Sequence, residues 1–188
     1  LAGLGAGGVA ALYNWLLGIA HQGMTENFRM NRLLMWIQPE NYSSGIGYQT
    51  VQGLYAIGSG GLFGKGLGKS LQKLGFIPES QNDMIFSIIC EELGLFGAMC
   101  IILVFALMLW RIIHIAQNAP DLFGTMLAAG VFAHVAVQVV LNIAVVTNFI
   151  PNTGVSLPFI SYGGTASFFL LLEMGIVLNI SSKIRLER

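Results

Sequence analysis

The feature that most constrains this chain is a series of apolar stretches long enough to cross a lipid bilayer. Residues 1–20 read LAGLGAGGVAALYNWLLGIA without a charged side chain, and residues 93–110 form a second uninterrupted apolar run. A helix of about 20 residues spans the roughly 30 Å of hydrocarbon in a bilayer. Only 10% of the 188 residues are charged, whereas soluble domains carry about 25%. The chain is therefore predicted to be an integral membrane protein.

The predicted fold class is all-α, a polytopic membrane helix bundle with about five transmembrane helices in a single, partial membrane domain. The expected helices lie at residues 1–20, 46–61, 84–110, 122–148 and 165–181. A short amphipathic turn is expected around residues 28–37. Because residue 1 lies inside an apolar run, we expect the chain to be the C-terminal part of a longer protein.

The segment 46–61 is the least certain span. It is short and rich in glycine, and it carries Gln49 and Gln52. Irregular membrane segments with polar side chains tend to line cavities, because only there can their backbone find partners. Full crossing of the membrane by this segment stays open.

Charge and cysteine content exclude two other classes of function. The net charge is zero and the charges are confined to short stretches, so the chain has no basic face and no nucleic-acid partner is expected. Cys90 and Cys100 both fall on one predicted membrane helix. They are expected to be reduced core residues, and no cysteine or histidine spacing typical of a metal site is present.

The most polar stretch is the predicted outward loop at residues 62–83. Lys65, Lys69 and Lys73 follow at intervals of four, with leucines on the opposite face, so residues 62–76 are predicted to form an amphipathic helix in the membrane interface. Pro78 would end this helix. The lysines either extend toward lipid headgroups or bind the pyrophosphate of a lipid substrate.

Asp83 is the candidate catalytic residue of this loop, and two interpretations are open. It could act as a general base toward a hydroxyl, provided that the leaving group needs no protonation, as a pyrophosphate does not. Alternatively, it caps the helix that follows. Glu79 or Glu91 could join it in space. One of Glu91 and Glu92 is expected inside the bundle, paired with a lysine or with backbone, in a supporting role.

A polar stripe follows one predicted membrane helix. His134, Gln138 and Asn142 are spaced at intervals of four and must face protein or a wet cavity. Interhelical hydrogen bonding and a path for protons or substrate are both compatible with this pattern.

Basic residues predict the orientation. With five crossings, the loops after the first, third and fifth helices share one side, which the positive-inside rule assigns to the cytoplasm. The loop at 62–83 would then be extracytoplasmic and the C-terminus cytoplasmic. This assignment depends on 46–61 crossing. The residues that set it are Arg29, Arg32, Arg111, Lys183, Arg185 and Arg188.

Several motifs, in order along the chain, resemble the SEDS proteins (shape, elongation, division and sporulation: FtsW, RodA and SpoVE). They are GYQxxQ at 47–52, AIGSGG at 56–61, GxGLGKS at 64–70, PExxxD at 78–83, EELG at 91–94 and PNTGxxLPFISYGGT at 151–165. The last motif is closer to the FtsW/SpoVE branch than to RodA.

The resemblance implies a fold and an activity. SEDS proteins have ten membrane helices, so the chain would cover helices six to ten. They polymerise lipid II, an undecaprenyl-pyrophosphate-linked disaccharide peptide, into glycan strands on the outer face of the bacterial plasma membrane, in division or sporulation for this branch. Their partner is a class B penicillin-binding protein. Asp83 matches the family's essential aspartate and would deprotonate the acceptor sugar hydroxyl, with inversion at the donor.

Other residues are assigned roles around this aspartate. Lys69 and Lys73 are candidates for pyrophosphate contact from their spacing, with Glu79 nearby in sequence. The residues that match family motifs and are expected to shape the cavity are Gln49, Gln52, Ser161, Tyr162, Gly163, Gly164 and Thr165, supported by Pro151 and Pro158. No metal ligands are identified, and a divalent cation that assists the reaction is left as an alternative. Asn82 and Ala166 depart from residues common in the family.

Two other functions are compatible with the sequence. A lipid II flippase would use the polar stripe and the glycine-rich second segment. A non-catalytic scaffold would recruit the penicillin-binding protein without chemistry at Asp83.

Overall fold

The computed structural model describes residues 18, 28–37, 39, 46–70 and 82–184. These residues form the helices α2 (Phe28–Ile37), α3 (Ile46–Gly60), α4 (Ile85–Gln117), α5 (Leu122–Val146) and α6 (Gly164–Ser182), and no strand occurs among them. The all-α prediction is confirmed. The expected helix at 1–20 lies outside the described residues.

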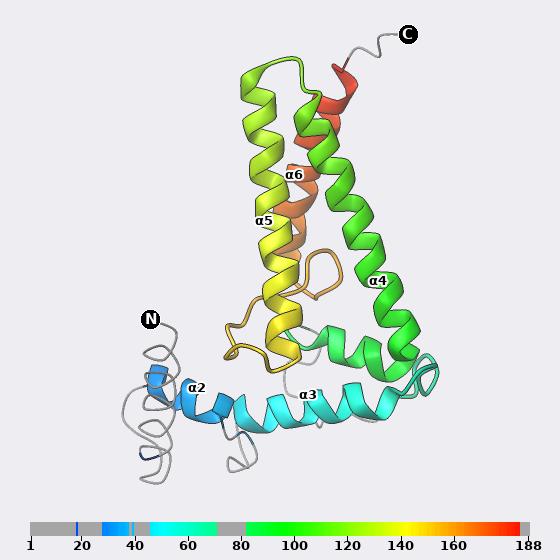
Figure 1. Ribbon diagram of the computed structural model, residues 1–188, viewed down its shortest axis with the longest axis vertical. Helices are drawn as coiled ribbons and strands as arrows, with labels where there is room; N and C mark the ends of the chain where they lie inside the picture. The colour runs from blue at the N-terminus through cyan, green and yellow to red at the C-terminus, as the bar shows by residue number, and fades with distance from the viewer. Residues whose placement is uncertain (1–17, 19–27, 38, 40–45, 71–81, 185–188) are drawn as a thin grey trace, which may run out of the picture.

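The long helices form a shaft, and the two shorter ones lie across its foot (Figure 1). Helices α4, α5 and α6 run side by side, while α2 and α3 follow one another roughly at right angles to them. The turn between α4 and α5 lies at the far end of the shaft, near the end of α6. The foot therefore gathers α2, α3, the start of α4 and the loop after α5.

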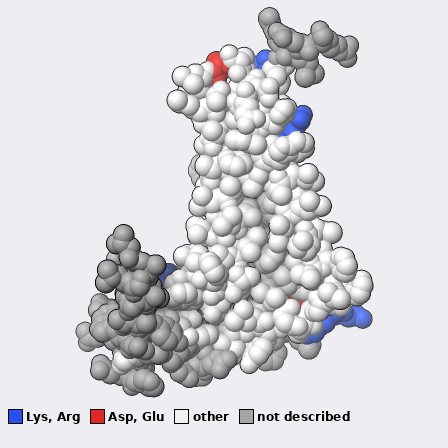
Figure 2. Space-filling model, viewed as in Figure 1, with Lys and Arg blue, Asp and Glu red and all other residues white. Residues whose placement is uncertain are grey.

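Three helices are long and apolar enough to cross a membrane among the residues described: Ile85–Gln117, Leu122–Val146 and Gly164–Ser182. Figure 2 shows charged atoms near the two ends of the shaft and uncharged atoms along its middle on this face. This distribution fits a helix bundle whose shaft is embedded in lipid and whose two ends face water.

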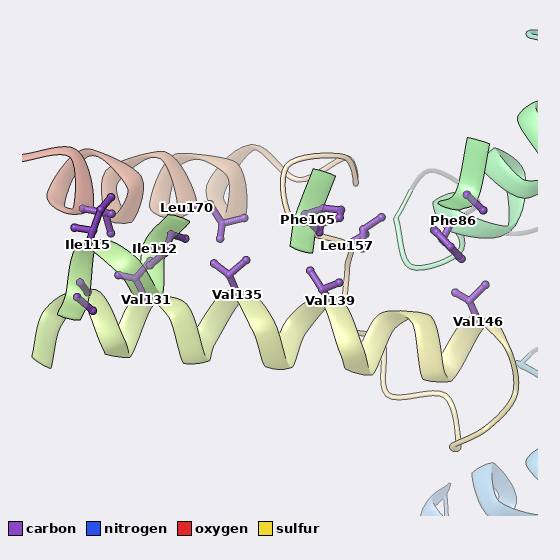
Figure 3. Close-up of a cluster of buried hydrophobic side chains, with 14 of the residues drawn as sticks. Phe86, Phe105, Ile112, Ile115, Val131, Val135, Val139, Val146, Leu157 and Leu170 are labelled. Carbon is purple, nitrogen blue, oxygen red and sulfur yellow. The ribbon is translucent and has the colours of Figure 1, made fainter. Parts of the chain in front are cut away.

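Helix α5 shows how local sequence sets an element. Asp121 has extended backbone and its Oδ2 accepts a hydrogen bond of 3.0 Å from Gly124 N, so it caps the helix start. Val131, Val135 and Val139, at intervals of four, are buried along one side. Figure 3 shows them turned toward side chains of α4 and α6, which form the core of the shaft.

Helix α4 is kinked at Gly94. This residue has φ +69° and ψ −166°, outside the helical region, and two helical pieces meet there. In Figure 1 the piece before Gly94 runs across the foot beside α3, and the longer piece rises along the shaft. The kink lets one helix contribute both to the foot and to the membrane-embedded shaft.

The second predicted span differs from the sequence expectation. Residues 46–60 are helical, but the helix has 15 residues, which is about 22 Å and short of the roughly 30 Å of hydrocarbon. It lies across the foot and not along the shaft. In this structure α3 therefore does not run along the shaft; it lies beside the first piece of α4 at the foot.

The placement of Arg32 was consequently wrong. The charge argument put it on the side of Arg111, but its Nη1 donates a hydrogen bond of 3.3 Å to the backbone oxygen of Asn152, in the loop after α5. Trp36 Nε1 likewise donates to the backbone oxygen of Asn148 at 3.0 Å. Because α3 does not run along the shaft, α2 stays at the foot with this loop.

The amphipathic helix predicted over 62–76 is not formed in its described part, residues 62–70, which consists of turns and bends. The backbone N–H groups of Lys65 and Gly66 donate to the carbonyl oxygens of Glu91 and Glu92, at 2.9 and 3.0 Å, instead of to carbonyls of their own segment. Lys65 therefore does not share an exposed helix face with Lys69. Tertiary hydrogen bonds to α4 override the helical periodicity.

Candidate active site at the foot of the bundle

Asp83 lies directly before α4, at the foot of the shaft. The helix begins at Ile85 with Met84 as its N-cap, so the capping position predicted for Asp83 is taken by its neighbour. Asp83 is half-buried. A Cβ placed on Gly154 would lie 3.6 Å from Asp83 Oδ2, so the carboxylate faces the loop that follows α5.

Two side chains hold the backbone on which Asp83 lies. Ser161 Oγ donates a hydrogen bond of 2.7 Å to the carbonyl oxygen of Asn82 and accepts one of 2.7 Å from Leu157 N. Asn142 Nδ2 donates to the carbonyl oxygen of Asp83 at 2.9 Å. Residues from α5 and from the loop after it therefore fix the candidate base from two sides.

The SYGG residues line a pocket next to this backbone. The pocket measures about 430 Å³ and is lined by Ile85, Ile160, Ser161, Tyr162, Gly163, Gly164 and Ser167. Tyr162 is 77% exposed and Thr165 is exposed beside it. Pro158 is buried and Pro151 half-buried in the same loop. The structure thus brings Ser161 and its neighbours together with the start of α4.

Glu91 is fully buried and satisfied by side chains of the loop that follows α3. Lys65 Nζ lies 2.7 Å from Oε1, Ser59 Oγ lies 3.4 Å from the same oxygen, and Ser70 Oγ donates to Oε2. One of the two adjacent glutamates was expected to pair with a lysine, and Glu91 does so. Lys65 is therefore engaged by Glu91, although its side chain remains 34% exposed.

Backbone contacts press the same loop against the kink of α4. A Cβ on Gly64 would lie 2.2 Å from the carbonyl oxygen of Glu92, and one on Gly94 would lie 2.3 Å from Gly64 N. Both glycines have positive φ, +75° and +69°, a region that other residues enter only at a cost in free energy. Leu95 N and Phe96 N also donate to carbonyls of the loop. The loop and the kink therefore form one closely packed unit.

The remaining predicted residues are less closely connected to Asp83. Gln49 and Gln52 are half-buried on α3, and Gly53 of that helix lies against Met84. The Oε1 atom of Glu92 is buried without a hydrogen-bond partner in the described part of the chain. Lys73 and Glu79 lie outside the described residues.

The predicted polar stripe of α5 divides into two parts. Asn142 turns to the foot of the bundle, whereas His134 Nδ1 lies 2.9 Å from Glu173 Oε2 on α6. His134 and Gln138 both line a pocket of about 470 Å³, together with Val155 of the loop after α5. The sequence showed the stripe and a charge on the last helix, but periodicity within one helix does not say which helix it faces.

Within residues 28–37, 46–70 and 82–184, no three His, Cys, Asp or Glu side chains gather as a metal site.

Comparison with known proteins decides the family. The family model described as "Cell cycle protein", for FtsW, RodA and SpoVE, matches residues 6–186. This chain belongs to the FtsW/RodA/SpoVE family. The match confirms the SEDS resemblance drawn from the motifs.

Relatives place the chain in the FtsW/SpoVE-like branch. It is 46% identical to stage V sporulation protein E of Bacillus subtilis over 166 residues, covering 88% of this chain and 45% of that protein. It is 44% identical over 159 residues to the probable peptidoglycan glycosyltransferase FtsW of Trichlorobacter lovleyi, covering 85% of this chain and 42% of the relative. The chain spans less than half the length of these relatives.

Solved structures share the fold of this SEDS chain. A chain of a peptidoglycan synthase complex, studied for the structural coordination of polymerization and crosslinking, matches with a TM-score of 0.64 and 23% identity, over 96% of this chain and 49% of that one. The rod shape determining protein RodA of Thermus thermophilus matches with a TM-score of 0.54 and 23% identity, over 92% and 64%.

Proposed function

We propose that this SEDS chain is part of a peptidoglycan glycosyltransferase that polymerises lipid II into glycan strands at the outer face of the plasma membrane, in division or sporulation. Relatives named as probable peptidoglycan glycosyltransferases and as a sporulation protein support this class of activity. A class B penicillin-binding protein is the proposed partner, and membrane lipid surrounds the shaft.

The observation that carries the proposal is the placement of Asp83. The Asp83 carboxylate lies at one end of an apolar shaft, where lipid-linked substrate and water would meet. Its backbone is held by Asn142 and Ser161, and the SYGG pocket of about 430 Å³ lies beside it, lined in part by Ile85. Catalytic groups need this kind of fixed geometry, because misplacement by about 1 Å can lower a rate roughly 100-fold.

The chemistry follows from a single base. Asp83 accepts the proton of the acceptor sugar hydroxyl, whose oxygen then attacks the anomeric carbon of the donor. The bond from that carbon to the pyrophosphate oxygen breaks, and undecaprenyl pyrophosphate leaves with its electron pair, giving inversion. The leaving group needs no proton, so one carboxylate suffices. Lys69, which is exposed on the loop after α3, is the proposed pyrophosphate contact among the residues that the structure describes, and Lys73 is a second candidate. A divalent cation is an alternative source of positive charge.

Lipid II polymerisation by the full-length protein with its partner tests the role of Asp83. Asp83→Asn keeps the size and hydrogen-bonding capacity of the side chain and removes the base. We expect glycan product to fall by about 100-fold or more with folding and partner binding intact. Wild-type product from the variant would refute the general-base role.

Transport of lipid II is a second candidate, favoured by the polar pair in the shaft. Glu173 and His134 lie on helices long enough to span the membrane, and ionisable residues in such segments often mark paths for substrate or protons. A flipping assay in proteoliposomes separates the two functions. Transport predicts that Glu173→Gln impairs flipping while Asp83→Asn does not; polymerisation predicts the reverse pattern in the synthesis assay.

A further inference from the structure

We infer that Glu91 is a positioning residue for the reaction at Asp83: its buried carboxylate holds the loop after α3 against the kink of α4. The Glu91 latch consists of Glu91 with Lys65, Ser59 and Ser70. The inference rests on the proposed function, because it assigns a role toward the proposed base.

The latch is built from a carboxylate that water does not reach. Glu91 is 0% exposed, and both of its oxygens accept hydrogen bonds from the loop: Lys65 Nζ at 2.7 Å on Oε1, and Ser70 Oγ on Oε2. A buried ionised group is tolerated only when it is paired and hydrogen-bonded. The loop therefore has to stay in place for Glu91 to remain buried and charged.

Main-chain bonds fix the same loop in register with the carboxylate. Lys65 N and Gly66 N donate to the carbonyl oxygens of Glu91 and Glu92, at 2.9 and 3.0 Å. Lys65 is thus bound to Glu91 twice: its backbone N–H donates to the Glu91 carbonyl oxygen, and its Nζ donates to the Glu91 carboxylate. This double attachment fixes where the loop after α3 contacts α4.

The latch and the site share a rigid element. Asp83 lies just before α4 and Glu91 lies in about the second turn of that helix, so the two are joined by continuous helix. The polar segment that begins at Lys65 is held at Ser70 by Glu91 and at Asn82 by Ser161. Loss of the Ser70–Glu91 hydrogen bond removes one attachment of this segment, and the position of the loop relative to Asp83 is then expected to change.

Three single variants and one matched control test the latch in the full-length protein with its partner, in nanodiscs. Glu91→Gln removes the charge, and Lys65→Met removes the cation while keeping most of the side-chain length. Lys183→Met is the control, because Lys183 is an exposed lysine at the opposite end of the shaft. Lys65→Arg retains the positive charge and is expected to restore function.

Two measurements are made on each variant: hydrogen exchange of the amides of residues 62–70, and kcat and KM for lipid II. We expect Glu91→Gln and Lys65→Met to speed exchange by about ten-fold or more. Their kcat should fall by roughly 100-fold while KM changes by less than about two-fold. The Lys183→Met control should match wild type in exchange rate, kcat and KM. Unchanged exchange, or faster exchange with wild-type kcat, would overturn the inference.

A double variant separates positioning from stability. Lys65→Met with Glu91→Leu replaces both charged partners by apolar side chains, which commonly restores folding. A folded but slow double variant supports positioning, whereas a double variant that regains wild-type kcat shows that Glu91 acts only on stability. Asp83→Asn is measured in parallel. If it keeps wild-type kcat, the general-base role fails; unchanged exchange in Glu91→Gln refutes the latch alone, so the two failures are distinguishable.

Discussion

Asn142 on α5 donates a hydrogen bond of 2.9 Å from Nδ2 to the backbone carbonyl oxygen of Asp83, 59 positions earlier in the chain. The same nitrogen donates to the carbonyl oxygen of Val155 at 2.7 Å. Asn142 is fully buried, so no water replaces these bonds if the side chain is removed. One amide group thereby joins the shaft, the start of α4 and the loop after α5 at the proposed active site.

The first prediction concerns this amide. Asn142→Leu keeps the approximate volume but leaves two buried carbonyl oxygens without their donor, which lowers the free energy of unfolding by about 1–3 kcal/mol. Polymerisation should fall further than stability alone explains, because the backbone of Asp83 loses one support. Asn179→Leu, at an exposed site near the end of α6, is the control. Wild-type kcat in folded Asn142→Leu would contradict the prediction.

The second prediction concerns the kink. Gly94→Ala places a Cβ 2.3 Å from Gly64 N at a residue with φ +69°, which should destabilise the protein by about 3 kcal/mol or more. Gly130→Ala is the matched change, because a Cβ there meets nothing within 4 Å and the residue lies inside α5. It should be neutral or stabilise by up to about 1 kcal/mol. Thermal unfolding in nanodiscs measures both, and equal melting temperatures would contradict the close approach of loop and kink.

The third prediction concerns the pair in the shaft. His134 and Glu173 are partly exposed, at 53% and 26% of their side chains, and hydrogen bonds between membrane helices contribute about 0.6 kcal/mol on average. A double-mutant cycle with His134→Phe and Glu173→Gln should give a coupling energy near that value. Polymerisation by either single variant should stay near wild type. A large loss of flipping in these variants would favour the transport alternative instead.

The fourth prediction concerns the two ends of the shaft. Single cysteines replacing Arg32 and Thr153 should react with a membrane-impermeant maleimide from the same side, because Arg32 contacts Asn152 beside Thr153. Cysteines replacing Asn118 and Ser182 should react only after permeabilisation, since both lie at the far end.

The labelling experiment needs a background without reactive thiols. Cys100 is exposed and Cys90 buried, and both are free, so both are replaced by serine or alanine first. Labelling of Arg32→Cys from the same side as Asn118→Cys would support the topology predicted from the basic residues, in which α3 crosses the membrane.

Local features of this chain could be predicted because their causes are local. The helices at 85–117 and 122–146 follow from their apolar composition, since a helix with about 20 apolar residues is stable in lipid, where its backbone hydrogen bonds are satisfied within the helix. The cap of α5 is also local, because Asp121 accepts its hydrogen bond from Gly124, three residues later. One of Glu91 and Glu92 was expected to pair with a lysine or with backbone, because a buried carboxylate requires a partner, and Glu91 pairs with Lys65.

The tertiary structure decided which partner each group takes. Lys65 lies in turns against α4 and not on a helix, because its N–H and Nζ both find Glu91, 26 residues away. Helical periodicity describes only neighbours within a few residues. The family motifs singled out Asp83, but the support of its backbone by Asn142 could not be read from either segment. The sequence by itself determined the long apolar helices. Only the fold decided that residues 62–70 form turns and how the polar groups pair, because hydrogen bonds over long separations depend on where the helices pack.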